Sequence, residues 1–216
     1  MKKLILFAVA IFMAATASAQ KVSSTTYVRE KPQTMWYGRI GMSINNLAGA
    51  PDGLDMGSKV GMDVDFGFQR NIRHSGLYWG MELGIGTRGA SIGEGEDKLS
   101  LSAWNLKYSP VTFGYKYSLT DDIKLDGHLG AFLSYDFTRS AKYKDGEKWD
   151  DDDFDDVDYQ KFDAGMQVGI GVWYKRFNLD FTYQRGFAPM AKAWDDNDKE
   201  YKFHSSNFMI RLGVAF

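Results

Sequence analysis

The chain has 216 residues, a formal net charge of −2 and no cysteine. The near-neutral charge argues against a general nucleic-acid binder, and the lack of cysteine excludes disulfide bonds and a lipid anchor on cysteine. Glycine is frequent (23 residues), proline is rare (4 residues) and 15% of the chain is aromatic, a composition that favours many half-apolar strands.

Residues 1–19 have the composition of a secretory signal peptide. Two lysines open the segment, an apolar stretch follows, and Ala17-Ser18-Ala19 supplies a small-residue cleavage site. The apolar stretch is too short for a membrane anchor, and no later stretch is apolar for long enough to form a transmembrane helix. We therefore expect export and cleavage, then a polar periplasmic lead over residues 20–33 and one barrel domain over residues 34–216.

Eight segments after residue 33 alternate apolar and polar residues with a period of two. Residues 60–68 are the clearest case, because every second position is Val, Met or Phe. Successive side chains of a strand point to opposite faces, so each segment predicts a strand with one apolar face. The predicted strands cover residues 34–44, 59–69, 77–88, 99–117, 123–138, 162–174, 177–185 and 204–216.

The fourth predicted strand changes phase along its length. Trp104, Leu106 and Tyr108 are out of phase with the other apolar positions of the strand, and Pro110 follows them. An inserted residue turns every later side chain to the other face, so we expect a bulge near Pro110. The apolar positions expected on the other phase are Leu99, Leu101, Ala103, Val111, Phe113, Tyr115 and Tyr117.

The predicted connections alternate between long and short. The long ones cover residues 45–58, 89–98, 139–161 and 186–203, and the short ones cover residues 70–76, 118–122 and 175–176. Outer-membrane barrels sort their connections in this way, with short periplasmic turns and long extracellular loops. An even number of strands also leaves both termini at the periplasmic side.

The composition of the two strand faces distinguishes a membrane barrel from a soluble barrel with an apolar interior. The polar face is rich in Gly and Asp and poor in Lys and Glu, unlike a solvated surface. Aromatic residues on the apolar face gather near both strand ends, as they do at the two membrane interfaces. We therefore predict an all-β fold: an eight-stranded antiparallel up-and-down transmembrane β-barrel.

The polar face predicts a charged lumen. Eight strands leave an interior that side chains fill, and buried charges need partners. We favour an internal ion-pair network that plugs the barrel over a conducting pore. Its predicted members are Arg39, Asp63, Asp65, Glu82, Arg88, Lys116, Lys124, Asp126, His128, Asp136, Asp163, Asp180 and Arg211.

These features resemble the PorT-like outer-membrane β-barrel family of Gram-negative bacteria. The resemblance is carried by FDAGMQVGIGVWYK at residues 162–175, by the strand that contains Pro110 and by the terminal strand ending in Phe216. It implies insertion by the outer-membrane assembly machinery, which recognises the last strand. The residues of that assembly signal are Phe208, Ile210, Leu212, Val214 and Phe216. No motif supports carrying over the secretion role of one namesake of the family.

The clearest local charge feature is KWDDDDFDDVD at residues 148–158, in the third long connection. Carboxylate oxygens are the ligands that Ca²⁺ takes, so the run is a candidate cation site that could bridge to lipopolysaccharide phosphates or to a partner. The alternative is a solvated acidic loop, since EF-hand spacing is absent. The candidate ligands are Asp150, Asp151, Asp152, Asp153 and Asp155.

The sequence favours a non-enzymatic outer-membrane protein that is structural or that binds a surface partner through its loops. No phosphate-binding loop, nucleophile elbow or zinc-binding helix motif is present, and no cofactor is expected besides a possible Ca²⁺. His128 is read as a hydrogen-bonding residue of the lumen. A small pore or uptake channel is the first alternative, and a lipid-modifying enzyme of the outer leaflet is the second.

Overall fold

A computed structural model describes residues 34–49, 56–72, 75–92, 99–143, 148–149, 160–194 and 200–216. These residues form the strands β1 (Thr34–Ala48), β2 (Met56–Asn71), β3 (Leu77–Ile92), β4 (Leu99–Ser118), β5 (Ile123–Tyr143), β6 (Lys148–Trp149), β7 (Phe162–Tyr174), β8 (Phe177–Trp194) and β9 (Glu200–Ala215). No helix in the described part of the chain is long and apolar enough to cross a membrane.

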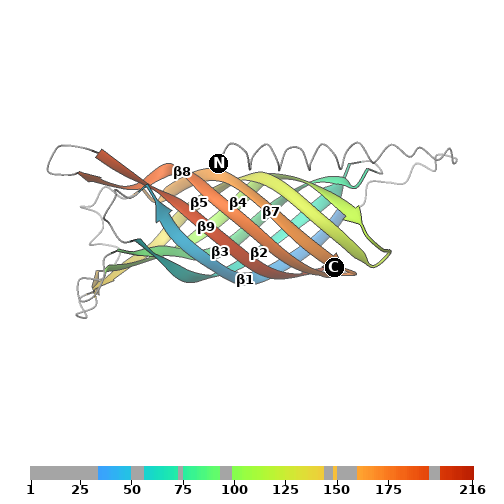
Figure 1. The fold of residues 1–216 in the computed structure, drawn as a ribbon, viewed down its shortest axis with the longest axis horizontal. Helices are drawn as coiled ribbons and strands as arrows, with labels where there is room; N and C mark the ends of the chain where they lie inside the picture. Colours follow the sequence, from blue (N-terminus) through green and yellow to red (C-terminus); the bar gives the residue numbers. More distant parts are fainter. Residues whose placement is uncertain are drawn as a thin grey trace.

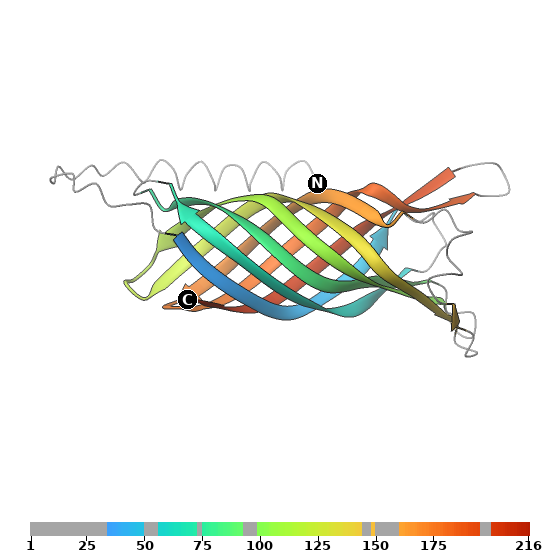
Figure 2. The ribbon, with the colours of Figure 1, turned by 180° about the vertical axis from the view of Figure 1, so that it is seen from behind.

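The strands close into one antiparallel barrel, and they are steeply tilted to its long axis (Figures 1 and 2). Apart from the short β6, strands that follow one another in the sequence pair, so that β5 pairs with β7; β1 pairs with β9, and the pairing of β4 with β5 completes the circle. β6 contributes only two residues, which pair with Ala141 and Lys142 of β5. Eight strands therefore form the wall, which confirms the predicted fold class.

We call the two ends of the barrel the turn end and the loop end. The turn end carries residues 75–76, 119–122 and 175–176 together with Phe216, and the loop end is opposite. The turn at 175–176 joins β7 to β8 with only two residues, and Lys175 takes a left-handed φ of 53° to make it. The predicted alternation of short and long connections holds only in part: residues 195–199 between β8 and β9 are as few as residues 72–76 between β2 and β3, and only the segment between β5 and β7 is much longer than the turns.

Several strands are longer than predicted at the loop end. β5 ends at Tyr143 rather than residue 138, and β8 ends at Trp194 rather than residue 185. The pairing of β8 with β9 continues to Trp194 and Glu200. Backbone hydrogen bonds stabilise this extension. The strand ends were predicted from the alternation of apolar residues, and backbone pairing does not require that alternation.

The predicted bulge in β4 is present. The pairing of β4 with β5 shifts between Tyr108 and Val111, on either side of Pro110. Leu106 and Tyr108 face outward before the shift, and Phe113 faces outward after it. The expected outward position of Ala103 is wrong, because Ala103 shares the phase of the inward side chains before the bulge and is buried.

Apolar side chains cover the outside of the barrel, and polar side chains fill the inside. Ile170 and Leu212 are among the most exposed side chains, at 66% and 64%, whereas Arg211 beside Leu212 is only 1% exposed. The arrangement is the reverse of a soluble barrel. Near the turn end an aromatic cluster forms on β1, β2 and β3 and on the residue that follows β9, and its neighbouring ring centroids lie 5.2–5.8 Å apart. Its members are Trp36, Phe66, Phe68, Trp79 and Phe216.

Candidate functional site

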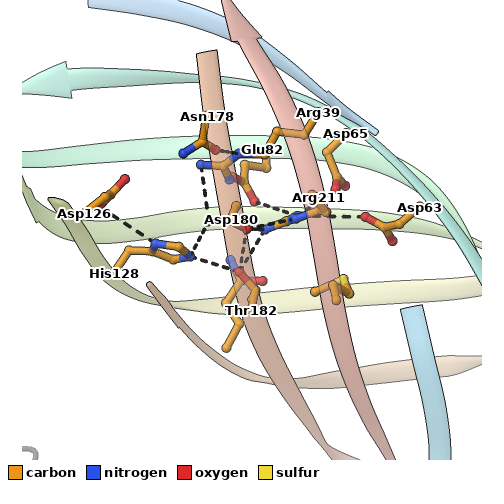
Figure 3. A network of polar contacts seen from close by, with 12 residues as sticks. Arg39, Asp63, Asp65, Glu82, Asp126, His128, Asn178, Asp180, Thr182 and Arg211 are labelled. Carbon is orange, nitrogen blue, oxygen red and sulfur yellow. Dashed lines mark hydrogen bonds and ion pairs between the residues drawn. The ribbon is translucent and has the colours of Figure 1, made fainter. Parts of the chain in front are cut away.

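Arg211 is the centre of a charged cluster in the lumen (Figure 3). Alternation along β9 turns its side chain inward, between Asp65 of β2 and Asp180 of β8. Its Nη1 lies 2.7 Å from Asp65 Oδ2, and its Nη2 lies 2.6 Å from Asp180 Oδ1. Nη2 also donates to the Thr182 hydroxyl at 2.9 Å. One guanidinium thus connects β9 to its neighbour β8 and, past β1, to β2.

Two further bases extend this cluster. Arg39 of β1 pairs with Glu82 at 2.6 Å and approaches Asp180 at 3.6 Å. Lys107 of β4 pairs with Asp63 and lies 3.2 Å from Asp65. The central cluster, as we use the term, comprises Arg39, Asp63, Asp65, Glu82, Lys107, Asp180 and Arg211, all of which are buried.

Buried aromatic and polar side chains pack in the lumen between the central cluster and the turn end. Tyr78 donates from its hydroxyl to Asp126 at 2.7 Å, and the Trp173 indole donates to the same carboxylate at 3.0 Å. The Tyr37 ring lies edge-on to Trp173 and its hydroxyl donates to Glu82 at 2.6 Å. These large rings are buried and pack the lumen at this level.

A smaller cluster lies nearer the loop end. Arg88 of β3 has its Nε 2.7 Å from Asp136 and its Nη1 3.3 Å from Asp163. The same Nη1 donates to the Ser134 hydroxyl at 3.0 Å, and Ser205 donates to Asp163. This cluster joins β3, β5, β7 and β9 across the interior.

Glycines make room for these clusters. A Cβ on Gly84 would collide with the Asp65 carboxylate, and a Cβ on Gly114 would collide with the Tyr78 ring. The mixture of glycine with large charged or aromatic residues on the inward face therefore reflects close packing inside a narrow barrel.

The arrangement is suited to holding the strands of the wall together. Every charge of the central cluster has an opposite charge within ion-pair distance. Removing one partner from a buried pair is strongly destabilising, because the remaining charge keeps its desolvation cost without compensation. The cluster therefore makes a change in the shape of the lumen costly.

The structure does not give His128 an open catalytic position. Its Nε2 lies 3.1 Å from the Thr182 hydroxyl, which itself donates to Asp180, and its Nδ1 lies 3.9 Å from Asp126. All four side chains are buried in the packed lumen. His128 thus lies where a hydrogen-bonding role in the lumen was expected.

Two predicted network members lie apart from these clusters. Lys116 is partly buried and Lys124 is exposed, and both line the mouth of the lumen at the turn end. The prediction also missed Lys107, although Leu106 and Tyr108 were recognised as sharing one face. The residue between two outward side chains must point inward, so the signal for Lys107 was present in the sequence.

Two other sites were predicted from the sequence: the acidic run and the assembly signal on the last strand. The acidic run Asp150–Asp153 with Asp155 lies outside the described residues. On β9, Phe208, Leu212 and Val214 point outward and are exposed, and Phe216 follows the strand, also exposed. These positions agree with an outward apolar face, and the role of the strand in assembly stays a prediction.

Comparison with known proteins identifies the family. The chain is similar to the attachment invasion locus protein Ail of Yersinia pestis (15% identity, 85% of this chain and 99% of that chain, TM-score 0.41). It is also similar to Neisserial surface protein A (15% identity, 84% of this chain and 97% of that chain, TM-score 0.45). No curated protein matches the chain. The family described as the outer membrane protein beta-barrel domain matches residues 26–192, which is most of the sequence, and the protein therefore belongs to this family of outer-membrane barrels.

Proposed function

We propose that this outer-membrane barrel is a closed, non-enzymatic scaffold that acts through the connections at its loop end. The central cluster is the observation that carries the proposal. Arg211, Arg39 and Lys107 reach across the interior to four carboxylates, and Tyr37, Tyr78 and Trp173 fill the section next to them. A barrel packed in this way is suited to holding the connections at its ends in place, and it is not suited to conducting ions or solutes.

Planar-bilayer recordings test the closed lumen. We expect no stepwise conductance from the purified barrel, because a hydrated ion would have to displace paired buried charges. Faster migration of the unheated sample on a gel would show that the recorded protein is folded. Discrete, reproducible conductance steps from such a sample would refute the closed scaffold and favour the pore alternative.

The connections at the loop end are the proposed place of binding. Connections on a rigid scaffold vary without disturbing the fold, and they commonly carry recognition. We propose that the long connections face the exterior after export and signal cleavage, where outer-membrane lipid, lipopolysaccharide or a surface protein could be bound. A PorT-like affiliation within the family is part of this proposal, with no secretion role attached.

The acidic run of the third long connection gives a specific prediction. Ca²⁺ added to the parent protein should change the fluorescence of Trp149, which directly precedes Asp150 in the sequence. Replacing Asp150–Asp153 with serine should abolish the change and leave the heat-dependent gel shift intact. A Trp149→Phe variant assigns the signal to that residue.

The control for this experiment replaces Asp121 and Asp122 with serine. These acids lie at the turn end, opposite the long connections, and both are exposed. The control should respond to Ca²⁺ as the parent does. A parent protein that shows no response would identify the acidic run as a solvated surface.

A further inference from the structure

The lumen opens at the turn end into a hollow of about 370 Å³. We call it the turn-end vestibule. It lies at the ends of β1, β2, β4, β5 and β9, on the far side of the Tyr78 and Trp173 layer from the central cluster. Its lining residues are Thr34, Met35, Asn71, Lys116, Lys124 and Phe216.

Lys116 is held in a fixed place on the floor of this vestibule. Its Nζ lies 4.4 Å from the centroid of the Trp173 ring and 5.2 Å from that of the Tyr78 ring. Both rings are buried and are tied to Asp126 by hydrogen bonds. The aromatic faces attract the ammonium without neutralising it, and they leave its N–H donors available to the vestibule.

Lys124 brings a second ammonium to the same space. Lys116 is paired with Asp126, and Lys124 is paired with Ser118, so the two lysines are diagonal neighbours on β4 and β5. Diagonal neighbours on one face have Cα atoms about 7–8 Å apart, within reach of long side chains. Both side chains can therefore converge on one group between them.

Neither lysine forms a close ion pair with an acid in the described part of the chain, although Asp126 is the register partner of Lys116 and its charge acts on that ammonium. Lys116 contacts the two rings and the Met35 sulfur at 4.0 Å, and no ion pair forms at Lys116 or Lys124. Asp126 already accepts two hydrogen bonds from Tyr78 and Trp173. Asp126 offsets part of the Lys116 charge, and Lys124 adds a second positive charge that no described acid pairs with, so the vestibule favours the binding of an anion.

We propose that the turn-end vestibule binds a phosphate group between the Lys116 and Lys124 ammoniums. Each ammonium is a compact cation with three donors, and a tetrahedral phosphate offers acceptor oxygens to both. Thr34 and Asn71 add neutral donors at the wall. The group can belong to free inorganic phosphate or to the headgroup of an anionic phospholipid, because both present the same oxygens.

Titration of the detergent-purified barrel with inorganic phosphate tests the site. At constant ionic strength in a zwitterionic detergent, calorimetry should show saturable binding. Lys116→Gln and Lys124→Gln should each weaken the affinity about tenfold, the effect of losing one charge-assisted hydrogen bond. Lys175→Gln is the matched control, because Lys175 lies at the same end, is exposed and pairs with Asp122 at 3.8 Å; its affinity should equal that of the parent.

Two results would overturn the proposal: no saturable binding to the parent protein, or equal affinity in the parent and in a Lys124→Gln variant that keeps its heat-dependent gel shift. Lys124 is exposed, so its replacement should not impair folding. Repeating the titration in phosphatidylcholine vesicles with and without phosphatidylglycerol identifies the source of the phosphate. Loss of phosphate binding only in the anionic vesicles would indicate a lipid headgroup, and equal binding in both would indicate free phosphate.

Discussion

Replacement of Arg211 by methionine is expected to lower the free energy of unfolding by about 3–5 kcal/mol, the range found when one partner of a buried ion pair is removed. Methionine keeps the length of the side chain but leaves Asp65 and Asp180 without the guanidinium that lies 2.7 Å and 2.6 Å from them. Denaturant-induced unfolding from phosphatidylcholine vesicles measures the change.

Arg176→Met is the control for this prediction. Arg176 is exposed in the turn between β7 and β8, where the loss of a charge has little energetic consequence. A loss at position 211 no larger than that of the control would show that the carboxylates do not depend on Arg211. The lumen would then be filled with water or rearranged in a way that the ion-pair distances do not describe.

A second variant separates the loss of electrostatic attraction to Arg211 from the loss of side-chain packing at position 211. The variant adds Asp65→Asn and Asp180→Asn to Arg211→Met. It eliminates the two carboxylate charges that have lost their closest partner. Much of the loss should be recovered, because the cost of a broken buried pair lies chiefly in the charge left behind. Single and combined substitutions at these three positions, compared in double-mutant cycles, give the coupling free energies between them.

The barrel itself could be predicted because a strand that faces lipid on one side and the lumen on the other alternates apolar and polar residues in its sequence. In β7 every second residue from Phe162 to Tyr174 is apolar or aromatic, and the strand has the predicted bounds. The bulge at Pro110 was predictable for the same reason, since the side chains must return to the lipid face. The extension of β8 to Trp194 was not, because backbone pairing beyond the apolar band needs no alternation.

The sequence predicts which side chains lie in the lumen, but it does not predict which of them pair with one another. Alternation indicates that Arg39 and Asp180 point inward, but it does not give the stagger of the strands around the barrel. Arg211 and Asp65 are 146 residues apart in the chain and meet only because β9 and β2 both flank β1. Lys116 was expected within the ion-pair network, and its stacking on Trp173 depends on the same stagger.

Replacement of Val168 by arginine is expected to lower the free energy of unfolding in vesicles by about 2–4 kcal/mol, the cost of arginine near the bilayer midplane on the lipid face of a barrel. Val168 is the middle residue of β7 and is 56% exposed on the outer surface. Its neighbour Gln167 is 2% exposed and accepts a hydrogen bond from Gln184 at 2.8 Å, which fixes the facing of the strand.

Val168→Leu is the matched control, because it changes the size of the side chain and keeps its apolar character. On a surface solvated by hydrocarbon, this variant should unfold like the parent. The arginine penalty should also shrink in vesicles of shorter acyl chains, since the guanidinium then reaches the interface more easily. An arginine variant as stable as the leucine variant in both thicknesses would show that Val168 does not face hydrocarbon, and the outward apolar surface would then need another partner to cover it.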